Sequence, residues 1–126
     1  MRKWLLLAAA ISCEVTASLS LKGALDAPAL YLVVVTGYLA SFAFLALVLR
    51  AGLPLGVAYG IWGALGVALT ALLSAALFAE PLTALMGLGI VLIIGGVLLV
   101  ELGSQRAHDR AERLRDQTQR ADEVTA

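Results

Sequence analysis

Four long apolar runs dominate the first hundred residues of this 126-residue chain. They cover residues 4–21, 29–49, 53–78 and 82–100, and each reaches or approaches the roughly 20 residues that a helix needs to cross a bilayer. Short segments rich in Gly, Pro and charged residues separate them. Because only helices or closed barrels can span lipid, and the runs lack strand alternation, we expect helices. The pattern predicts an all-α membrane protein with four transmembrane helices.

The first run has a second interpretation, because Arg2 and Lys3 precede a short apolar stretch that ends in small residues before Cys13. This arrangement imitates a secretory signal with a lipoprotein-type cleavage site. Cleavage there would leave three spans. Ala10 is a poor residue at the start of such a site, so we expect the first run to be retained.

Residues 104–126 form a tail of different character, rich in Arg, Asp, Glu and Gln. We therefore divide the chain into a four-helix transmembrane domain, residues 1–103, and a charged cytosolic C-terminal tail, residues 104–126. Pairs such as Asp109 and Arg113 suit a solvated helix, but no apolar stripe is available for burial, so we expect a frayed helix. The nine basic and nine acidic residues balance, which gives no sign of a nucleic-acid partner.

Glu14 lies in the middle of the first apolar run, within about one helical turn of the bilayer midplane. A charge there costs about 2.5–3.5 kcal/mol on insertion scales, so such residues usually face a bundle interior or a wet cavity. No Lys or Arg inside the spans can pair with it. Because burial disfavours the charged form, the carboxyl group can hold a proton or a cation but not both, which is the basis of proton-coupled antiport. The alternative is a packing glutamate, hydrogen-bonded to a neighbouring helix.

The remainder of a cation site has to be aromatic or hydroxylic, because no other span carries an internal charge. Small residues and a hydroxyl share the face of Glu14, at helical spacings of three and four. Aromatic rings attract organic cations by about 0.5–2 kcal/mol each. The alternative is that these aromatic residues only pack. The candidate substrate- and proton-binding residues are Glu14, Ser18, Tyr38, Ser41, Tyr59 and Trp62.

Small residues also recur at helical spacing. Gly56, Gly60 and Ala64 repeat every four residues, which predicts a face that allows close helix approach. Gly89 and Gly96 lie seven residues apart, so they share one face of the fourth span. Spacing alone leaves open whether that face packs within one subunit or between subunits. Four spans are few for enclosing a transport pathway, which favours an oligomer.

These features together resemble the small multidrug resistance transporters. The resemblance covers about residues 3–103 and is carried by Glu14, Lys22, "YLASF" at 38–42 and "PLGVAYGIWGALG" at 54–66. It implies an antiparallel dimer that exchanges protons for cations by alternating access, with Glu14 of both subunits in a shared site. The six candidate residues match family site positions, and the resemblance assigns the face of Gly89 and Gly96 to the dimer contact.

Two residues depart from the family pattern. Ala43 stands where multidrug members often have a tryptophan, so one aromatic wall is missing. Ala64 replaces the first glycine of the bend in the third helix, which we expect to stiffen or shift the hinge.

The leading functional prediction is a proton-coupled antiporter that exports hydrophobic organic cations, with quaternary ammonium compounds first and polyamines next. A guanidinium-type exporter is disfavoured, because those relatives usually carry a tryptophan shortly after the glutamate, where this chain has Val15, Thr16 and Ala17. A lipid-carrier flippase subunit is a second alternative, but those relatives generally lack a glutamate in the first helix, so Glu14 argues against it. A non-transporting membrane subunit is a further alternative. No nucleophile, metal cluster or phosphate-binding loop indicates an enzyme, and we expect no cofactor and no metal.

The placement of basic residues predicts the orientation in a bacterial inner membrane. Arg2, Lys3, Arg50 and the five tail arginines lie on one side of the four spans, and only Lys22 lies on the other. The positive-inside rule then places the termini in the cytoplasm. Since an antiparallel homodimer needs nearly unbiased insertion, we expect an antiparallel dimer with a paired family member of opposite bias. A homodimer is the alternative.

Overall fold

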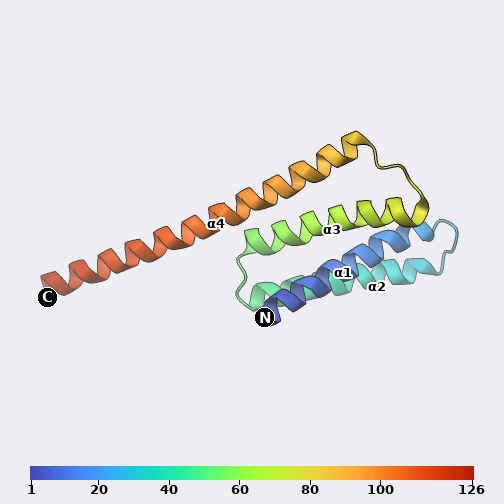
Figure 1. The fold of residues 1–126 in the computed structure, drawn as a ribbon. Helices are drawn as coiled ribbons and strands as arrows, with labels where there is room; N and C mark the ends of the chain where they lie inside the picture. Colours follow the sequence, from blue (N-terminus) through green and yellow to red (C-terminus); the bar gives the residue numbers. More distant parts are fainter.

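The computed structural model describes all 126 residues as four helices joined by short loops (Figure 1). In chain order these are α1 (Arg2–Gly23), α2 (Leu30–Arg50), α3 (Leu55–Phe78) and α4 (Ala84–Thr125). Each has the length and apolar composition to cross a membrane. The predicted all-α membrane protein with four transmembrane helices is confirmed.

The helix ends follow the predicted turn chemistry. Gly52 adopts a φ of 91°, which permits the tight turn between α2 and α3, and Pro54 precedes the first residue of α3. Ala79 ends α3 in the left-handed conformation, with a φ of 53°. At the start of α4 the Thr83 hydroxyl accepts a hydrogen bond of 3.2 Å from the Met86 backbone N–H.

Helices α1, α2 and α3 form the packed part of the molecule. The buried core lies mainly where α1 meets α2 and the first half of α3, and includes Leu7, Ile11, Leu45, Val48 and Trp62. Close contact between α1 and α2 depends on Gly37, because a Cβ there would lie 2.9 Å from the Ala17 Cβ and 3.3 Å from the Cys13 carbonyl oxygen.

Helix α4 packs against α3 alone and contributes no buried residue. Its Val100 side chain lies near Gly56 and Gly60, 3.8 and 3.9 Å from where a Cβ would stand on each, so this part of the small-residue face of α3 does admit another helix. Figure 1 shows α4 inclined to α3, approaching it toward the beginning of α3 and then extending well beyond the other three helices.

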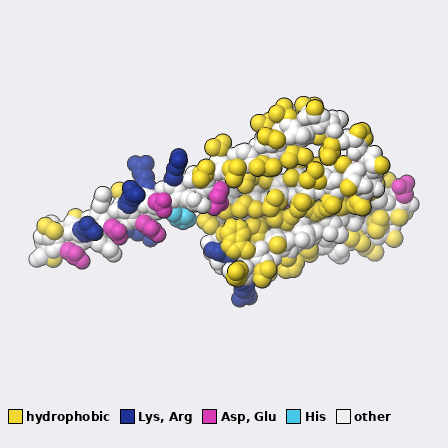
Figure 2. Space-filling model, viewed as in Figure 1, with side chains coloured by type: hydrophobic (Ala, Val, Ile, Leu, Met, Phe, Trp, Pro, Cys, Tyr) yellow, Lys and Arg dark blue, Asp and Glu magenta, His cyan; other side chains and the backbone are white.

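The tail continues α4 without a break to Thr125, where we expected a frayed helix. Figure 2 shows the Arg, Asp and Glu side chains concentrated along this extension, while hydrophobic side chains cover the four-helix part. Large apolar residues such as Leu32, Val91 and Leu99 are exposed there, as a lipid- or protein-facing surface requires. The division into two domains at residue 103 stays a prediction based on composition.

Candidate functional site

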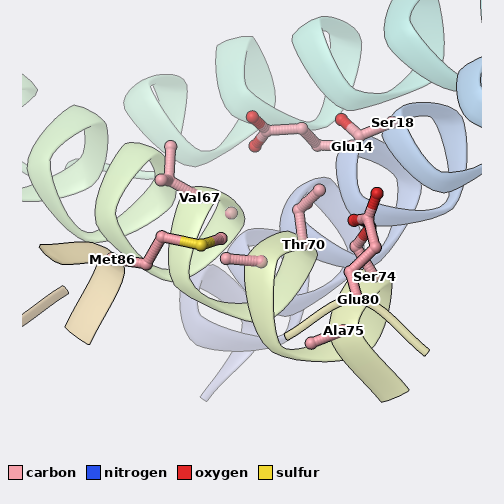
Figure 3. Close-up of a pocket in the computed structure, with 10 residues that line it drawn as sticks. Glu14, Ser18, Val67, Thr70, Ser74, Ala75, Glu80 and Met86 are labelled. Atoms are coloured by element: carbon pink, nitrogen blue, oxygen red, sulfur yellow. The ribbon is translucent and has the colours of Figure 1, made fainter. Parts of the chain in front are cut away.

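A cavity of about 340 Å³ lies between α1, α3 and the beginning of α4 (Figure 3). Helix α1 contributes the carboxylate of Glu14 and the hydroxyl of Ser18. Helix α3 contributes small and hydroxylic side chains on one face, and the loop after α3 contributes Glu80. The lining residues are Glu14, Ser18, Gly66, Val67, Thr70, Ala71, Ser74, Ala75, Glu80 and Met86.

The Glu14 carboxylate lies directly against Gly66 of α3. A Cβ on Gly66 would stand 2.8 Å from the Glu14 Cδ and 2.9 Å from Oε1, so only glycine leaves room for the carboxylate in this position. The second oxygen, Oε2, is shielded from solvent and has no hydrogen-bond partner. A buried acceptor without a partner is costly, so a proton or a bound cation would stabilise it.

The register of α1 against α3 determines which residues of the two helices face each other across the cavity. Helices α1 and α3 run in the same direction, and the Lys22 ammonium donates to the Ser74 hydroxyl at 3.4 Å, across a sequence separation of 52 residues. Glu14 and Gly66 have the same separation. Steps of four residues therefore carry Glu14, Ser18 and Lys22 along α1 in parallel with Gly66, Thr70 and Ser74 along α3. The two rows together place a carboxylate, an ammonium, three hydroxyl groups and one bare backbone position along the same groove.

The end of this groove farthest from the N-terminus holds a polar cluster. Lys22 forms an ion pair with Glu80 and lies 4.5 Å from the centroid of the Phe78 ring. The Ser74 hydroxyl donates to Glu80 Oε2 at 3.1 Å. A hydrogen bond from Lys22, and a smaller contribution from the Ser74 hydroxyl, hold the pKa of the Glu80 carboxyl below its ordinary value. Glu80 is therefore ionised at neutral pH.

Sequence reasoning missed this cluster, and it also missed Thr70 and Met86 as lining residues. Glu80 lies in the short segment between the third and fourth apolar runs, to which the sequence assigns no function. A signal for the ion pair did exist, since Lys22 and Glu80 each end an odd-numbered span and therefore lie on the same side of the membrane.

The predicted site residues separate into two groups. Ser18 lines the cavity beside Glu14, and its hydroxyl lies 2.9 Å from the Tyr38 hydroxyl of α2, within hydrogen-bond distance. Ser41 and Trp62 instead lie in the buried core, about one turn nearer the N-terminus of α1. The Trp62 Nε1–H donates to Ser41 Oγ at 3.1 Å, and Ser41 Oγ donates to the Ala10 carbonyl oxygen at 2.8 Å.

Two aromatic rings, those of Phe42 and Tyr59, lie beside the Trp62 ring. The ring centroids of Phe42 and Tyr59 each lie 5.4 Å from that of Trp62, in tilted arrangements that favour aromatic contact. Trp62 is 7% exposed, whereas Tyr59 is 57% exposed. Neither lines the cavity that contains Glu14. Cation binding by Ser41, Tyr59 and Trp62 stays a prediction.

The two glycines assigned to a dimer contact face open space. No atom of the protomer outside the helix lies within 4 Å of a Cβ built on Gly89 or Gly96. The two departures from the family pattern are also located: Ala43 is exposed, and Ala64 is buried within an unbroken α3.

A family model described as Small Multidrug Resistance protein matches residues 2–93. The chain belongs to the small multidrug resistance family. This match contains α1, α2, α3 and the first part of α4, and thus every residue that lines the cavity.

Individual relatives agree with the family match. A multidrug transporter of Pseudomonas aeruginosa is 43% identical over 107 residues, covering 83% of this chain and 96% of its own. The multidrug resistance protein EbrB of Bacillus licheniformis is 40% identical over 116 residues, 90% of this chain and 97% of its own. The quaternary ammonium compound-resistance protein QacE of Escherichia coli is 38% identical over 109 residues, with coverage of 83% and 96%. As a member of this family, the chain is a multi-pass membrane transporter of the multidrug-efflux type.

Proposed function

We propose that this chain exports hydrophobic organic cations in exchange for protons, with quaternary ammonium compounds as the first substrate class and polyamines as the second. One observation carries the proposal. Glu14 lies in the middle of the membrane-spanning helix α1, and its carboxylate lines a cavity of about 340 Å³. Its Oε2 atom has no hydrogen-bond partner. The name of the similar protein QacE supports quaternary ammonium compounds as substrates.

The charge balance of the cavity supports a cationic substrate. Its walls carry two carboxylates, Glu14 and Glu80, and no Lys or Arg. Glu80 is already paired with Lys22 at the cavity's end, so Glu14 is the charge left without a counter-ion. The remaining wall is mostly small or apolar, which suits a cation with a hydrophobic body.

Coupling follows from competition at one group. A proton on Glu14 removes the negative charge that attracts the cation, and a bound cation disfavours protonation. Binding of one therefore releases the other. If the cavity opens alternately to the two sides of the membrane, the proton gradient drives the cation outward.

A dimer is part of the proposal. The protomer leaves α4 without buried residues, and Gly89 and Gly96 face open space, so a second subunit would find a close-packing surface there. The excess of basic residues on one side of the spans favours one orientation, with cytoplasmic termini in a bacterial inner membrane. We therefore propose an antiparallel pair with a second family member, and a homodimer as the alternative.

The experiment that tests the function is pH-gradient-driven ethidium transport in liposomes. Glu14→Gln keeps the side-chain size but removes the titrating group, so transport should fall to the level of empty liposomes. Glu14→Asp should retain transport with a changed pH dependence. Thr16→Ala is the matched control, because Thr16 is exposed on the same helix and bonds only to the Ser12 carbonyl. Full transport by a folded Glu14→Gln protein would refute the proposal.

A further inference from the structure

We propose that Glu80 is a positioning residue for cation binding. It neutralises the Lys22 ammonium and holds it at the end of the cavity, so that Glu14 acts as an uncompensated negative charge. The inference rests on the proposed cation transport and adds a residue of the α3–α4 loop to its machinery.

The position of Lys22 creates the need for such a residue. Lys22 lies on the same face of α1 as Glu14 and Ser18, and eight residues, or about 12 Å along the helix axis, separate it from Glu14. Its side chain is a flexible four-carbon stem with a charged end. An unrestrained ammonium here could turn along the groove toward Glu14 and compete with a cationic substrate.

Three contacts hold the ammonium away from Glu14. Lys22 pairs with Glu80, donates to Ser74 at 3.4 Å, and lies over the Phe78 ring at 4.5 Å. The last turns of α3 and the loop that follows supply all of these groups. Figure 3 shows Ser74 and Glu80 together at one end of the cavity, with the Glu14 carboxylate at the other.

Few charged or titratable groups lie around Glu14. On α1 the charged group is Lys22, about two helical turns from Glu14. Helix α2 contributes Tyr38, whose hydroxyl contacts that of Ser18, and the α3–α4 loop contributes Glu80. Neither α3 nor α4 contributes a titratable side chain to the cavity. Lys22 and Glu80 cancel, so removing one of them leaves a single unit charge near the cation site.

The sign of that charge predicts the effect. A unit charge about 12 Å away, in an environment with an effective dielectric constant of about 20, changes cation affinity roughly tenfold. Without Glu80 the ammonium is uncompensated and repels the cation. Without Lys22 the second carboxylate is uncompensated and attracts it. A purely structural role for the ion pair would instead weaken binding in both variants.

The test is equilibrium binding of tetraphenylphosphonium to the full chain in bilayers, as a function of pH. We expect Glu80→Gln to raise the Kd about tenfold and Lys22→Met to lower it. The double variant, which restores the charge balance, should return within about twofold of the parent. The plot of log Kd against pH bends where the proton begins to compete, and this bend should move to lower pH in Glu80→Gln and to higher pH in Lys22→Met.

Asp26→Asn is the matched control. It removes one negative charge from the loop between α1 and α2, at the same end of the bundle, from an exposed residue that does not line the cavity. Its Kd should stay within about twofold of the parent. Because Lys22→Met and the double variant are read independently, the test stands even when Glu80→Gln alone folds poorly.

The outcomes separate the two proposals. Binding that depends on Glu14, combined with shifts in the same direction or no shift in the two single variants, overturns the role of Glu80 and leaves the proposed function intact. Binding that is unchanged by Glu14→Gln overturns both.

Discussion

The carboxylate of Glu14 lies against the bare backbone of Gly66 on the parallel helix α3, at a distance that leaves no room for a Cβ. The position of the one carboxylate inside a span thus depends on a missing side chain on another helix. This relationship joins the two residues into a single structural unit, although they lie on different helices.

The first prediction concerns Gly66→Ala. The new methyl group would stand 2.8 Å from the Glu14 Cδ, so the carboxylate or α3 has to move. We expect cation affinity to fall at least tenfold, because a displaced carboxylate no longer lies in the cavity in the same position. Equilibrium binding of tetraphenylphosphonium measures this loss.

Gly63→Ala provides the control on the same helix. Apart from the backbone of its own helix, no atom lies within 4 Å of a Cβ built there, so the substitution should leave affinity nearly unchanged. Unaltered binding in a folded Gly66→Ala protein would show that the close approach of the two residues does not matter for the site.

The second prediction concerns Ser41, which is fully buried and bonds both to Trp62 and to the Ala10 carbonyl. Ser41→Ala leaves the Trp62 N–H buried without a partner, which costs about 1–3 kcal/mol. We expect a lower midpoint of unfolding, with cation affinity changed much less than stability.

Ser12→Ala is the control for Ser41, because the Ser12 hydroxyl bonds only to the Ala8 carbonyl of its own exposed turn. The reverse pattern, a normal unfolding midpoint with strongly reduced affinity, would support Ser41 as a cation ligand, as the sequence first predicts.

The case of Ser41 shows where sequence reasoning reached its limit. A hydroxyl in an apolar helix is a reasonable candidate ligand, but whether it is free depends on which groups the neighbouring helices present. Here Trp62 and Ala10 already use it, and this follows from the packing of three helices rather than from any local pattern.

Other parts of the fold were accessible from the sequence for clear physical reasons. Run length and turn residues such as Pro54 predict the ends of α1, α2 and α3 closely, and a lone carboxylate in a span makes Glu14 the first candidate for a functional residue. Helical spacing also predicts that Ser18 accompanies Glu14 on one face. The register that sets Glu14 against Gly66, and Lys22 against Ser74, requires the three-dimensional packing of α1 on α3.

The third prediction concerns Gly89 and Gly96 of α4, which have open space beside them in the protomer. Gly96→Val adds a branched side chain to a face that is open in the protomer. If this face forms the dimer contact, close helix approach is lost and the dimer dissociation constant should rise about tenfold, measured by energy transfer between labelled subunits in liposomes. Gly87→Val is the control, since Gly87 is equally open but lies on the opposite side of α4. Equal effects of the two substitutions would contradict the assignment of Gly89 and Gly96.

The last prediction concerns orientation, and it decides between a paired subunit and a homodimer. Eight basic residues lie on the side of the termini and only Lys22 on the other. The nearest tail arginines, Arg106 and Arg110, lie within α4 itself, close enough to its apolar part to influence insertion. We therefore expect the chain, expressed alone, to insert with its tail in the cytoplasm.

A cysteine introduced at Thr118, in a Cys13→Ala background, reports the orientation through an impermeant maleimide. In intact cells this tail cysteine should react only after the membrane is permeabilised, because the tail lies inside. Replacing Arg106, Arg110 and Arg113 with Gln weakens the charge bias and should increase the fraction that is labelled from outside. A chain with one orientation cannot form an antiparallel homodimer, so transport should then require a second family member. Labelling from both sides of the membrane, together with transport by this chain alone, would instead establish the homodimer, and would mean that the tail arginines do not control insertion.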